Sequence, residues 1–351
     1  MFNPLQFYEF GKRRIIGFVS TWKTDNNSTG SSANNQVKLP LLSNGTYNFV
    51  VNWGDGISDT ITAYNQAQTT HTYASIGTYT IKITGILSSL YFPGGDILKL
   101  IGISSWGYTD TRTDHSSAFQ GVSNLTSFAQ NIDWLNLIVG GFQMFRSSGL
   151  NQLPTTLSLN LLTNGSNMFR NTFITALPES MLLNSLSNGQ SMFQDVTQLA
   201  VLPSNLTLNS LTNGAAMFRS TAITSLPSVM MLNSLTNGNA MFLSSLLVSL
   251  PSGITLNNLT NGSGMFQSAR LTSVPSSLTL QKLNNGSLMF LGCTLTTDSY
   301  SQLLININAN NTNTGITFHG GSSKYNSAGK VARDALTSRS PAWSITDGGL
   351  I

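Results

Sequence analysis

Charged residues are scarce in this sequence. Only 9% of its 351 residues are charged, whereas 40% are apolar and 31 are glycines. Intrinsic disorder needs low hydrophobicity together with high net charge, so this composition predicts a chain that folds. The formal net charge of +4 is the difference between 17 basic and 13 acidic residues, spread thinly along the chain. We therefore do not expect a nucleic-acid partner, because nucleic-acid binding needs a concentrated basic patch.

Cysteine and histidine are also scarce. Cys293 is the only cysteine, which excludes a disulfide within the chain and any zinc site built from cysteines. The three histidines, His71, His115 and His319, lie in three different regions, and residues 144–290 contain only two acidic residues. Catalysis needs paired carboxylates, a nucleophile with a base, or a metal cluster. The sequence therefore predicts a non-enzymatic protein with no cofactor and no metal.

Long apolar runs are absent as well. No run approaches the roughly 18 apolar residues of a membrane-spanning helix, so we expect no membrane insertion. The first residues, MFNPLQFYEFGKRRIIGFVS, do not read as a secretory signal. Their apolar stretch from Ile15 to Val19 is too short, and no small-residue cleavage pattern follows. A protein secreted by a cell would need such a signal. A protein that is assembled in the cytoplasm and released when the cell lyses would not.

One phrase recurs throughout the middle of the chain. Met-Phe pairs occur seven times, from Met144-Phe145 to Met289-Phe290, at spacings of 24, 24, 25, 24, 24 and 24 residues. A catalytic site has no reason to recur in this way. A unit that buries its apolar face only by stacking on a copy of itself does recur, at periods of this size. We therefore expect stacked coils, with Met and Phe pointing inward in register.

Each repeat reads N-G-x-x-M-F-x-x-x-x-[LI]-x-x-[LV]-P-x-x-x-x-L-N-x-L-x, as in residues 213–236. We expect a short strand near L-N-x-L-x-N, a turn at Asn-Gly, a short helical turn carrying Met-Phe, and a bend at proline, where a missing N–H is tolerated. The helical turn and the strand together would complete one coil.

Two files of asparagine run through the repeats. The first file is Asn164, Asn188, Asn213, Asn237, Asn261 and Asn285. We expect these side chains to form a ladder in which each one bonds to the backbone of the turn that it shares with its neighbour. The second file, which we expect to behave likewise, is Asn160, Asn184, Asn209, Asn233 and Asn257, and it ends where Gln281 replaces asparagine. Sugar binding is the functional alternative for both files.

Residues 16–92 read as an all-β region. The stretches 47–53 and 77–84 are rich in strand-forming residues, and the first of them ends at the turn Gly54-Asp55-Gly56. Asp55 and His71 are the polar residues that could mark a site here. We interpret them as a tight turn and a histidine that ties a strand to it; a metal or carbohydrate contact is the alternative, for which two residues supply few ligands.

These stretches carry two family resemblances. VNWGDG followed by HTYASIGTYTIKITG resembles the polycystic-kidney-disease (PKD) type of immunoglobulin-like β-sandwich. The phrase Leu-Thr-Asn-Gly-x-x-Met-Phe resembles the BspA-type leucine-rich repeats of bacterial surface antigens, a family that often places a WGDG-bearing β-domain in front. In this chain glycine stands where that family usually has an apolar residue. The resemblances imply a spacer or adhesion module followed by a repeat solenoid.

Residues 296–351 are expected to close the array as a cap with a polar outer face. Thr297-Asp298 can cap a helix over 299–307, and further elements follow as a strand at 315–319, a helix at 327–338 and a strand at 343–346. His319-Gly-Gly with Lys324 could instead form an anion-binding loop. The end of this region, Ala342 to Gly349, is similar to the endings of phage tail and fibre proteins.

The predicted fold class is mainly β with short helical turns. An N-terminal anchor segment (1–15) precedes an immunoglobulin-like β-sandwich (16–92), which is followed by a leucine-rich-repeat-type solenoid (93–295) and a small α/β cap (296–351). The predicted function is that of a phage virion structural protein, attached to capsid or tail and exposed on the virion surface. A secreted bacterial cell-surface adhesin of the BspA type is the alternative.

Two sets of contact residues follow from this hypothesis. The residues after Met-Phe vary from repeat to repeat, and arginine occupies three of the first four such positions. The candidate contacts with a host-surface glycan or protein are Arg146, Arg170 and Arg219. The N-terminal segment is too apolar to remain in solvent, so we expect it to dock on other virion proteins. Its anchor residues are Phe2, Leu5, Phe7, Tyr8 and Phe10. A homo-oligomer is also possible.

Overall fold

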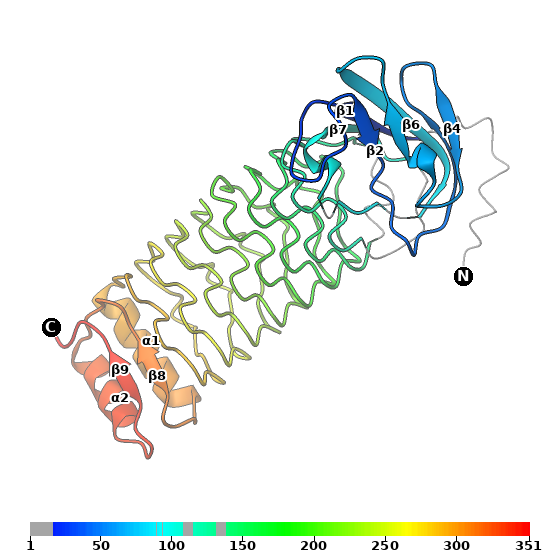
Figure 1. The fold of residues 1–351 in the computed structure, drawn as a ribbon. Helices are drawn as coiled ribbons and strands as arrows, with labels where there is room; N and C mark the ends of the chain where they lie inside the picture. Colours follow the sequence, from blue (N-terminus) through cyan, green and yellow to red (C-terminus); the bar gives the residue numbers. More distant parts are fainter. Residues whose placement is uncertain (1–16, 89, 93, 108–114, 131–137) are drawn as a thin grey trace.

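The computed structural model describes residues 17–88, 90–92, 94–107, 115–130 and 138–351. The chain forms an elongated body with a β-domain at the N-terminal end, a long stack of coils in the middle and two helices at the C-terminal end (Figure 1). Within the described residues there are nine β-strands and two α-helices, so the fold is mainly β as expected.

The β-domain contains two sheets. Five strands form an antiparallel sheet in the order β4-β3-β6-β1-β7. Their bounds are β1 Phe18–Lys23, β3 Tyr47–Asn52, β4 Ser58–Ile61, β6 Thr78–Leu87 and β7 Leu100–Ser105. A second, two-stranded sheet pairs β2 (Gln36–Lys38) with β5 (Thr70–Thr72). In β3, Tyr47, Phe49 and Val51 alternate with exposed residues, which is the pattern of a strand with one face on the core.

The five-stranded sheet extends past residue 92, where the sequence analysis ends the β-domain. Strand β7 pairs with β1, and its Leu100 and Ile103 are buried. Two short 3-10 helices, η2 (Ala67–Thr69) and η3 (Asp96–Leu98), precede β5 and β7. The later boundary has a physical reason: β1 is a central strand, and β7 satisfies the hydrogen bonds of its second edge.

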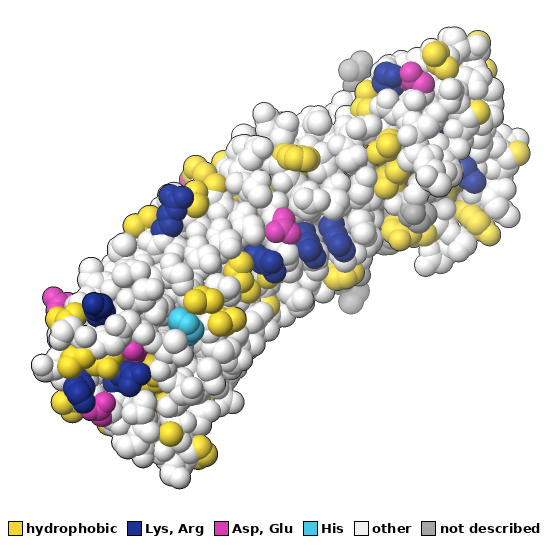
Figure 2. Space-filling model, turned by 60° about the vertical axis from the view of Figure 1, so that its left-hand side comes forward, with side chains coloured by type: hydrophobic (Ala, Val, Ile, Leu, Met, Phe, Trp, Pro, Cys, Tyr) yellow, Lys and Arg dark blue, Asp and Glu magenta, His cyan; other side chains and the backbone are white. Residues whose placement is uncertain are grey.

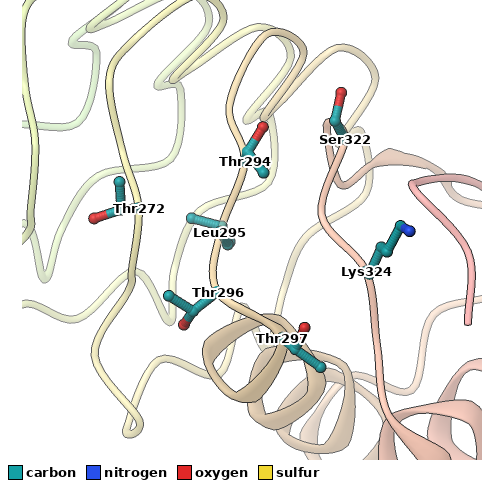
Figure 3. A pocket seen from close by; sticks show the side chains of 7 residues that line it. All are labelled: Thr272, Thr294, Leu295, Thr296, Thr297, Ser322 and Lys324. Carbon is teal, nitrogen blue, oxygen red and sulfur yellow. The ribbon is translucent and has the colours of Figure 1, made fainter. Parts of the chain in front are cut away.

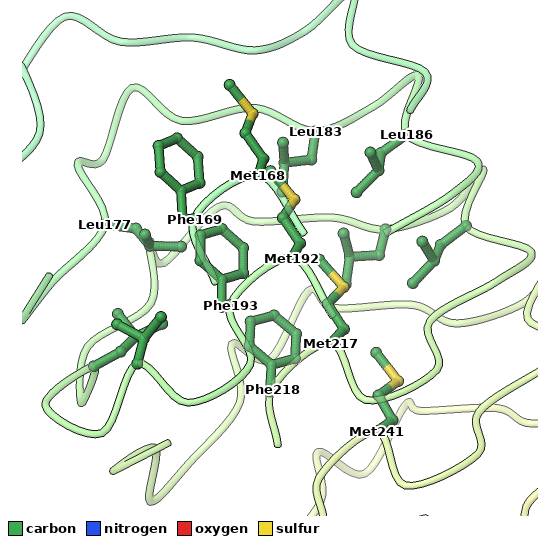
Figure 4. Packing of buried hydrophobic residues seen from close by; sticks show 14 of the residues in the cluster. Met168, Phe169, Leu177, Leu183, Leu186, Met192, Phe193, Met217, Phe218 and Met241 are labelled. Carbon is green, nitrogen blue, oxygen red and sulfur yellow. The ribbon is translucent and has the colours of Figure 1, made fainter. Parts of the chain in front are cut away.

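The repeats stack as coils, and we call the stack over residues 138–295 the column. Every Met and Phe of the seven pairs is fully buried, which confirms that they point inward. Successive phenylalanine rings from Phe145 to Phe290 stack with centroids 5.4 to 5.8 Å apart. Figure 4 shows part of this stack, with the methionine side chains in a parallel row beside the rings.

Local backbone structure in the coils differs from the expected strand. Where a short strand is predicted, the described coils have single parallel bridges, such as Asn188 to Asn213. The Met-Phe segment forms turns, as expected, and these turns do not extend into a helix because Ser191 and Asp195 have φ values of 54° and 60°. These residues turn their N–H groups toward the next coil, and Ser191 N–H donates to Ala215 O at 2.8 Å.

The predicted bend at proline is confirmed. In the coil that contains Pro203, the proline carbonyl accepts a hydrogen bond from Leu206 N–H at 3.1 Å. The same bond recurs at the five other repeat prolines. Proline fits this position because the turn uses its carbonyl and not its missing N–H.

Glycine follows asparagine in six of the seven coils because the next coil packs closely against it. A Cβ on Gly214 would lie 3.1 Å from Met241 Sδ and 3.1 Å from Leu211 Cδ2. Gly214 does not have a positive φ, so its requirement comes from packing and not from backbone conformation.

The C-terminal region closes the column. It contains α1 (Thr297–Asn310), β8 (Thr317–His319), α2 (Ser327–Thr337) and β9 (Ser344–Thr346), and β8 pairs with β9 in parallel. The N-cap of α1 is Thr296, one residue before the predicted pair, and its side chain accepts from Ser299 N–H. Phe318 meets Phe290 edge-on at 6.1 Å, which ends the ring stack.

The ring stack gives a stability prediction. We expect Phe218→Ala to lower the free energy of unfolding by about 3–5 kcal/mol, because truncating a buried ring leaves a cavity. Phe173→Ala is the control, since that side chain is 54% exposed. Chemical denaturation would measure both variants. A loss for Phe218→Ala no larger than that of the control would contradict the role of the stack.

Candidate partner-contact surface

The residues after Met-Phe form one file along the column, as the sequence predicts. In each step of this file, a carbonyl accepts a hydrogen bond from the preceding coil; Arg170 O accepts from Ser147 N–H at 2.8 Å. Arg146 and Arg170 are half-buried, whereas Arg219 is exposed. Figure 2 shows basic side chains in a row along the column, with an acidic side chain among them.

An acidic residue partly neutralises this row. Asp195 Oδ2 lies 3.8 Å from Arg170 Nη2, and both side chains are about one-third exposed. Gln194 follows Met192-Phe193 in the same file, but it is only 7% exposed, and its Nε2 donates to Asp195 Oδ2 at 3.0 Å. The 3.8 Å contact between Asp195 and Arg170 is too long and too exposed to hold the Arg170 side chain strongly. The surface therefore offers a weak positive row with one anion inside it.

The first asparagine file forms a ladder from Asn164 to Asn261. The carboxamide nitrogen of each later member donates to the Oδ1 of the preceding asparagine at 3.1 to 3.3 Å; the donors are Asn188, Asn213, Asn237 and Asn261. Each Oδ1 also accepts from the backbone N–H two residues later, as Asn213 does from Ala215 at 3.2 Å. The ladder is confirmed over this range, but it joins coils through side chains and not through the neighbouring backbone. Among the described contacts, Asn285 donates no such bond to Asn261.

The second asparagine file does not form the predicted ladder. Its members are exposed or half-buried, and their side-chain oxygens accept from threonine hydroxyls of the next coil, as where Thr279 Oγ1 donates to Asn257 Oδ1 at 2.6 Å. Thr207 donates to Asn184 Oδ1 in the same way, at 2.8 Å. No ladder forms here because these side chains lie toward solvent, where water can satisfy their amide donors.

Asp55 and His71 tie the WGDG turn to strand β5. His71 Nε2 lies 2.7 Å from Asp55 Oδ2, and Asp55 Oδ1 accepts from Ile57 N–H at 3.0 Å. The His71 ring stacks on Trp53 with centroids 4.8 Å apart and meets Tyr73 edge-on at 4.6 Å. Asp55 and His71 therefore bond to each other, as expected for a tight turn and a histidine that ties a strand to it.

A buried ion pair in the β-domain was not anticipated from the sequence. The side chain of Lys99 is fully buried, and its Nζ lies 3.4 Å from Asp96 Oδ1. Lys99 Nζ also donates to the carbonyls of Ser32, Ala33 and Gln36 at 2.9 to 3.0 Å. Burial lowers the pKa of Lys99 below its usual value, although Asp96 opposes this shift. The pair fastens the loop before β2 to the segment before β7.

A groove of about 370 Å³ lies where the last coil meets the cap. Figure 3 shows four threonines and Leu295 on one side and Ser322 with Lys324 on the other. His319, the other residue of the possible anion-binding loop, uses its Nδ1 to accept from Gly321 N–H at 3.0 Å. Gly321 has a φ of 72°, and a Cβ there would lie 2.2 Å from Cys293 O. The loop is thus a tight turn in which His319 has a structural contact.

The remaining sequence features concern metal ligands, membrane helices, Cys293 and the anchor residues. Within the described ranges, no three His, Cys, Asp or Glu side chains are grouped so that they could hold a metal ion. No helix of the described part of the chain is long and apolar enough to cross a membrane. Cys293 is buried, and burial raises the pKa of its thiol to about 11. The anchor residues Phe2 to Phe10 lie outside the described residues.

Comparison with known proteins adds no relative. No protein-family model, curated protein or solved structure matches the chain. The function therefore has to be argued from the residues and contacts described above.

The Asp55–His71 pair gives a pH prediction. Burial alone would raise the pKa of Asp55, but the hydrogen bonds from His71 and Ile57 outweigh it and hold that pKa below the usual value of 3.8. A carboxyl with a depressed pKa stabilises the fold above its unfolded-state pKa, and this contribution is lost as the pH falls through the folded-state pKa. Tryptophan fluorescence during acid titration would follow the loss.

The matched variant for this test is Asp55→Asn. We expect it to be less stable than the wild type at neutral pH, and the difference in unfolding midpoint to shrink as the pH falls below about 4, where an ordinary aspartate is protonated. A difference that stays constant from pH 7 to pH 2 would show that the charge of Asp55 contributes nothing.

Proposed function

We propose that this chain is a non-enzymatic structural and attachment protein of a phage virion. In this proposal an immunoglobulin-like β-sandwich of the PKD type is carried on a leucine-rich-repeat-type solenoid of the BspA type and is exposed on the virion surface. The protein attaches to capsid or tail through its N-terminal segment. Its column contacts acidic glycans or proteins on the host surface.

The two sheets of the β-domain and the contacts of the WGDG turn support the sandwich assignment. Trp53 follows a strand of the five-stranded sheet, and it stacks on His71 of the two-stranded sheet. Parallel bridges at a spacing of 24 or 25 residues, from Gly140 to Asn285, support the solenoid assignment. Each bridge joins the same position in consecutive coils, as the repeated units of a solenoid require.

One observation carries the functional proposal. The buried Met and Phe recur in all seven coils, whereas the position after Met-Phe changes from arginine to glutamine and leucine. Of the residues at this position, Arg219 is exposed, Gln194 is buried and the others are half-buried. A rod with an invariant interior can present a row of varied side chains at fixed spacing without altering its fold. Weak contacts of this kind become effective when many copies are displayed on one particle.

Location would test the proposal directly. Antibodies raised against the full chain would be used to probe gradient-purified phage particles and cell envelopes from the same lysed culture. We expect the protein to sediment with the particles and to be labelled on their surface by immunogold electron microscopy. Recovery in the cell envelope, with none in the particles, would overturn the virion assignment and support the adhesin alternative.

The arginine row gives a binding prediction. Changing Arg146, Arg170 and Arg219 together to Ser should reduce particle adsorption at low salt, because guanidinium groups pair well with carboxylates and phosphates. Adsorption of the wild type should also fall as salt is raised, since exposed charges are screened over about 8–10 Å at physiological ionic strength.

The control for this variant removes three positive charges elsewhere, by changing Arg270, Lys282 and Lys324 to Ser. These residues are exposed and lie outside the arginine row. Equal adsorption losses in both triple variants would mean that net charge matters and the row does not. A loss only in the control would assign the contact to the C-terminal end of the column.

The anchor prediction concerns residues 2–14. Their deletion should leave the β-domain and column folded but prevent incorporation into particles, because the apolar side chains from Phe2 to Phe10 would no longer meet a partner. Circular dichroism of the purified truncated chain would establish that it folds. Normal incorporation of that chain, measured by immunoblotting of purified particles, would show that attachment uses another part of the protein.

A further inference from the structure

Asn-Gly is the dipeptide that most readily forms a succinimide, because glycine has no side chain to hinder its own backbone nitrogen. In this reaction the glycine nitrogen attacks the asparagine Cγ, a C–N bond forms, and the carboxamide leaves as ammonia with the proton from the glycine nitrogen. Water then opens the ring to aspartate or isoaspartate. The chain contains seven Asn-Gly dipeptides, six of them in consecutive coils.

The packing of the column explains why this labile dipeptide recurs. Asparagine is needed because its side chain links one coil to the next, as Asn213 does to Asn188 at 3.1 Å. Glycine is needed at the following position because Met241 of the next coil packs against Gly214. The two requirements fall on adjacent residues, so the fold places a chemically labile pair in each of these coils.

Inside the ladder the reacting groups are all held by hydrogen bonds. The carboxamide nitrogen of Asn213, which would leave, donates to Asn188 Oδ1. The Oδ1 of Asn213 accepts from Ala215 N–H at 3.2 Å and from Asn237 Nδ2 at 3.1 Å. The attacking nitrogen, that of Gly214, donates to Asn237 O at 2.9 Å. Ring closure must break several of these contacts at once.

The C-terminal end of the ladder differs. Asn285 is exposed, and within the described residues its carboxamide nitrogen has no hydrogen-bond acceptor. Of the residues that the structure describes, only Ser287 donates to its Oδ1, through the backbone N–H at 3.1 Å and the hydroxyl at 2.8 Å. Gly286 N–H still donates to Thr317 O at 2.9 Å. The leaving group at Asn285 is therefore less restrained than in the interior coils.

We propose that the asparagine ladder suppresses spontaneous deamidation within the column, and that Asn285 is the site where deamidation of the column begins. The order of reactivity follows from the exposure of each carboxamide and from all of its hydrogen bonds. Asn164 Nδ2 also has no acceptor among the described residues, but Asn164 is half-buried and its Oδ1 accepts from Asn188 Nδ2 and Ser166 N–H, whereas Asn285 is exposed and no neighbouring coil donates to its Oδ1. Asn44, an exposed Asn-Gly in a loop of the β-domain with no described side-chain hydrogen bond, reacts first. Asn285 follows, and the four donors Asn188, Asn213, Asn237 and Asn261 react last.

Modification at Asn285 would act on the joint between column and cap. Isoaspartate inserts an additional backbone carbon between Asn285 and Gly286. Gly286 donates to Thr317 O, and it accepts from His319 N–H at 3.1 Å, so two of the bonds that join β8 to the last coil would be displaced. The junction with the cap is thus the first part of the column to be modified by deamidation, and this does not depend on what the protein binds.

The first test uses the unmodified full chain. The folded protein is incubated at mildly alkaline pH, and peptide mapping by mass spectrometry measures aspartate and isoaspartate at each Asn-Gly over time. We expect the order Asn44, then Asn285, then the interior positions. A parallel incubation in denaturant should bring all seven rates close together. Interior rates equal to that of Asn285 in the folded protein would overturn the proposal.

The second test separates the ladder from general rigidity. Asn213→Ala removes the acceptor of Asn237 Nδ2, whereas it removes only a donor to Asn188 Oδ1. Deamidation at Asn237 should accelerate about fivefold or more, the effect of losing one ordinary hydrogen bond, while Asn188 changes less. Asn209→Ala, an exposed position of the same repeat, is the control.

The second test depends on the difference between the deamidation rates at Asn237 and at Asn188. Equal acceleration at Asn188 and Asn237 would mean that the variant merely loosens the column, and no acceleration at either position would mean that the carboxamide bonds do not control the rate. Either result would overturn the role assigned to the ladder. If Asn213→Ala does not fold, the site-by-site rates of the unmodified chain still decide the proposal.

Discussion

The burial of one phenylalanine ring per coil against the rings of its neighbours is the interaction on which the column depends. A single coil of about 24 residues has no enclosed interior, so its Met and Phe side chains leave water only when another coil covers them. At the C-terminal end the stack closes on a different element, where Phe318 of β8 meets the last ring edge-on. At the other end Phe119 stacks on the Phe145 ring, and its segment bonds to the first coil as one coil bonds to the next.

Polar requirements follow from this stacking. Coils that approach closely bury their turn backbones, and each buried N–H needs an acceptor. The carbonyl of Asn237 supplies one for Gly214, and the carboxamides of the ladder satisfy the turns beside it. The close approach also explains why glycine must follow asparagine. The interior packing thereby requires asparagine followed by glycine on the wall of the column. This pair is prone to deamidation, which the hydrogen bonds of the ladder oppose.

The surface is freer, and there the candidate contacts lie. Arg146, Arg170 and Arg219 follow buried phenylalanines, so the core sets their spacing while their own identity is unconstrained by packing. Asp195 lies within this row and weakens it. The sequence shows that the arginines form one file, because the repeat period alone determines this. It does not show that Gln194 turns inward to reach Asp195, since that depends on local left-handed backbone at Asp195.

The sequence by itself determined the features that depend on periodicity: inward Met and Phe, the bend at Pro203 and its equivalents, and the helices and strands that close the column. These follow from short-range pattern and from the need to bury one face. Only the tertiary structure decided which side chains meet across coils, and that Lys99 is buried with partners 63 to 67 residues away. Such contacts depend on the offset between adjacent coils and sheets, which no local pattern encodes.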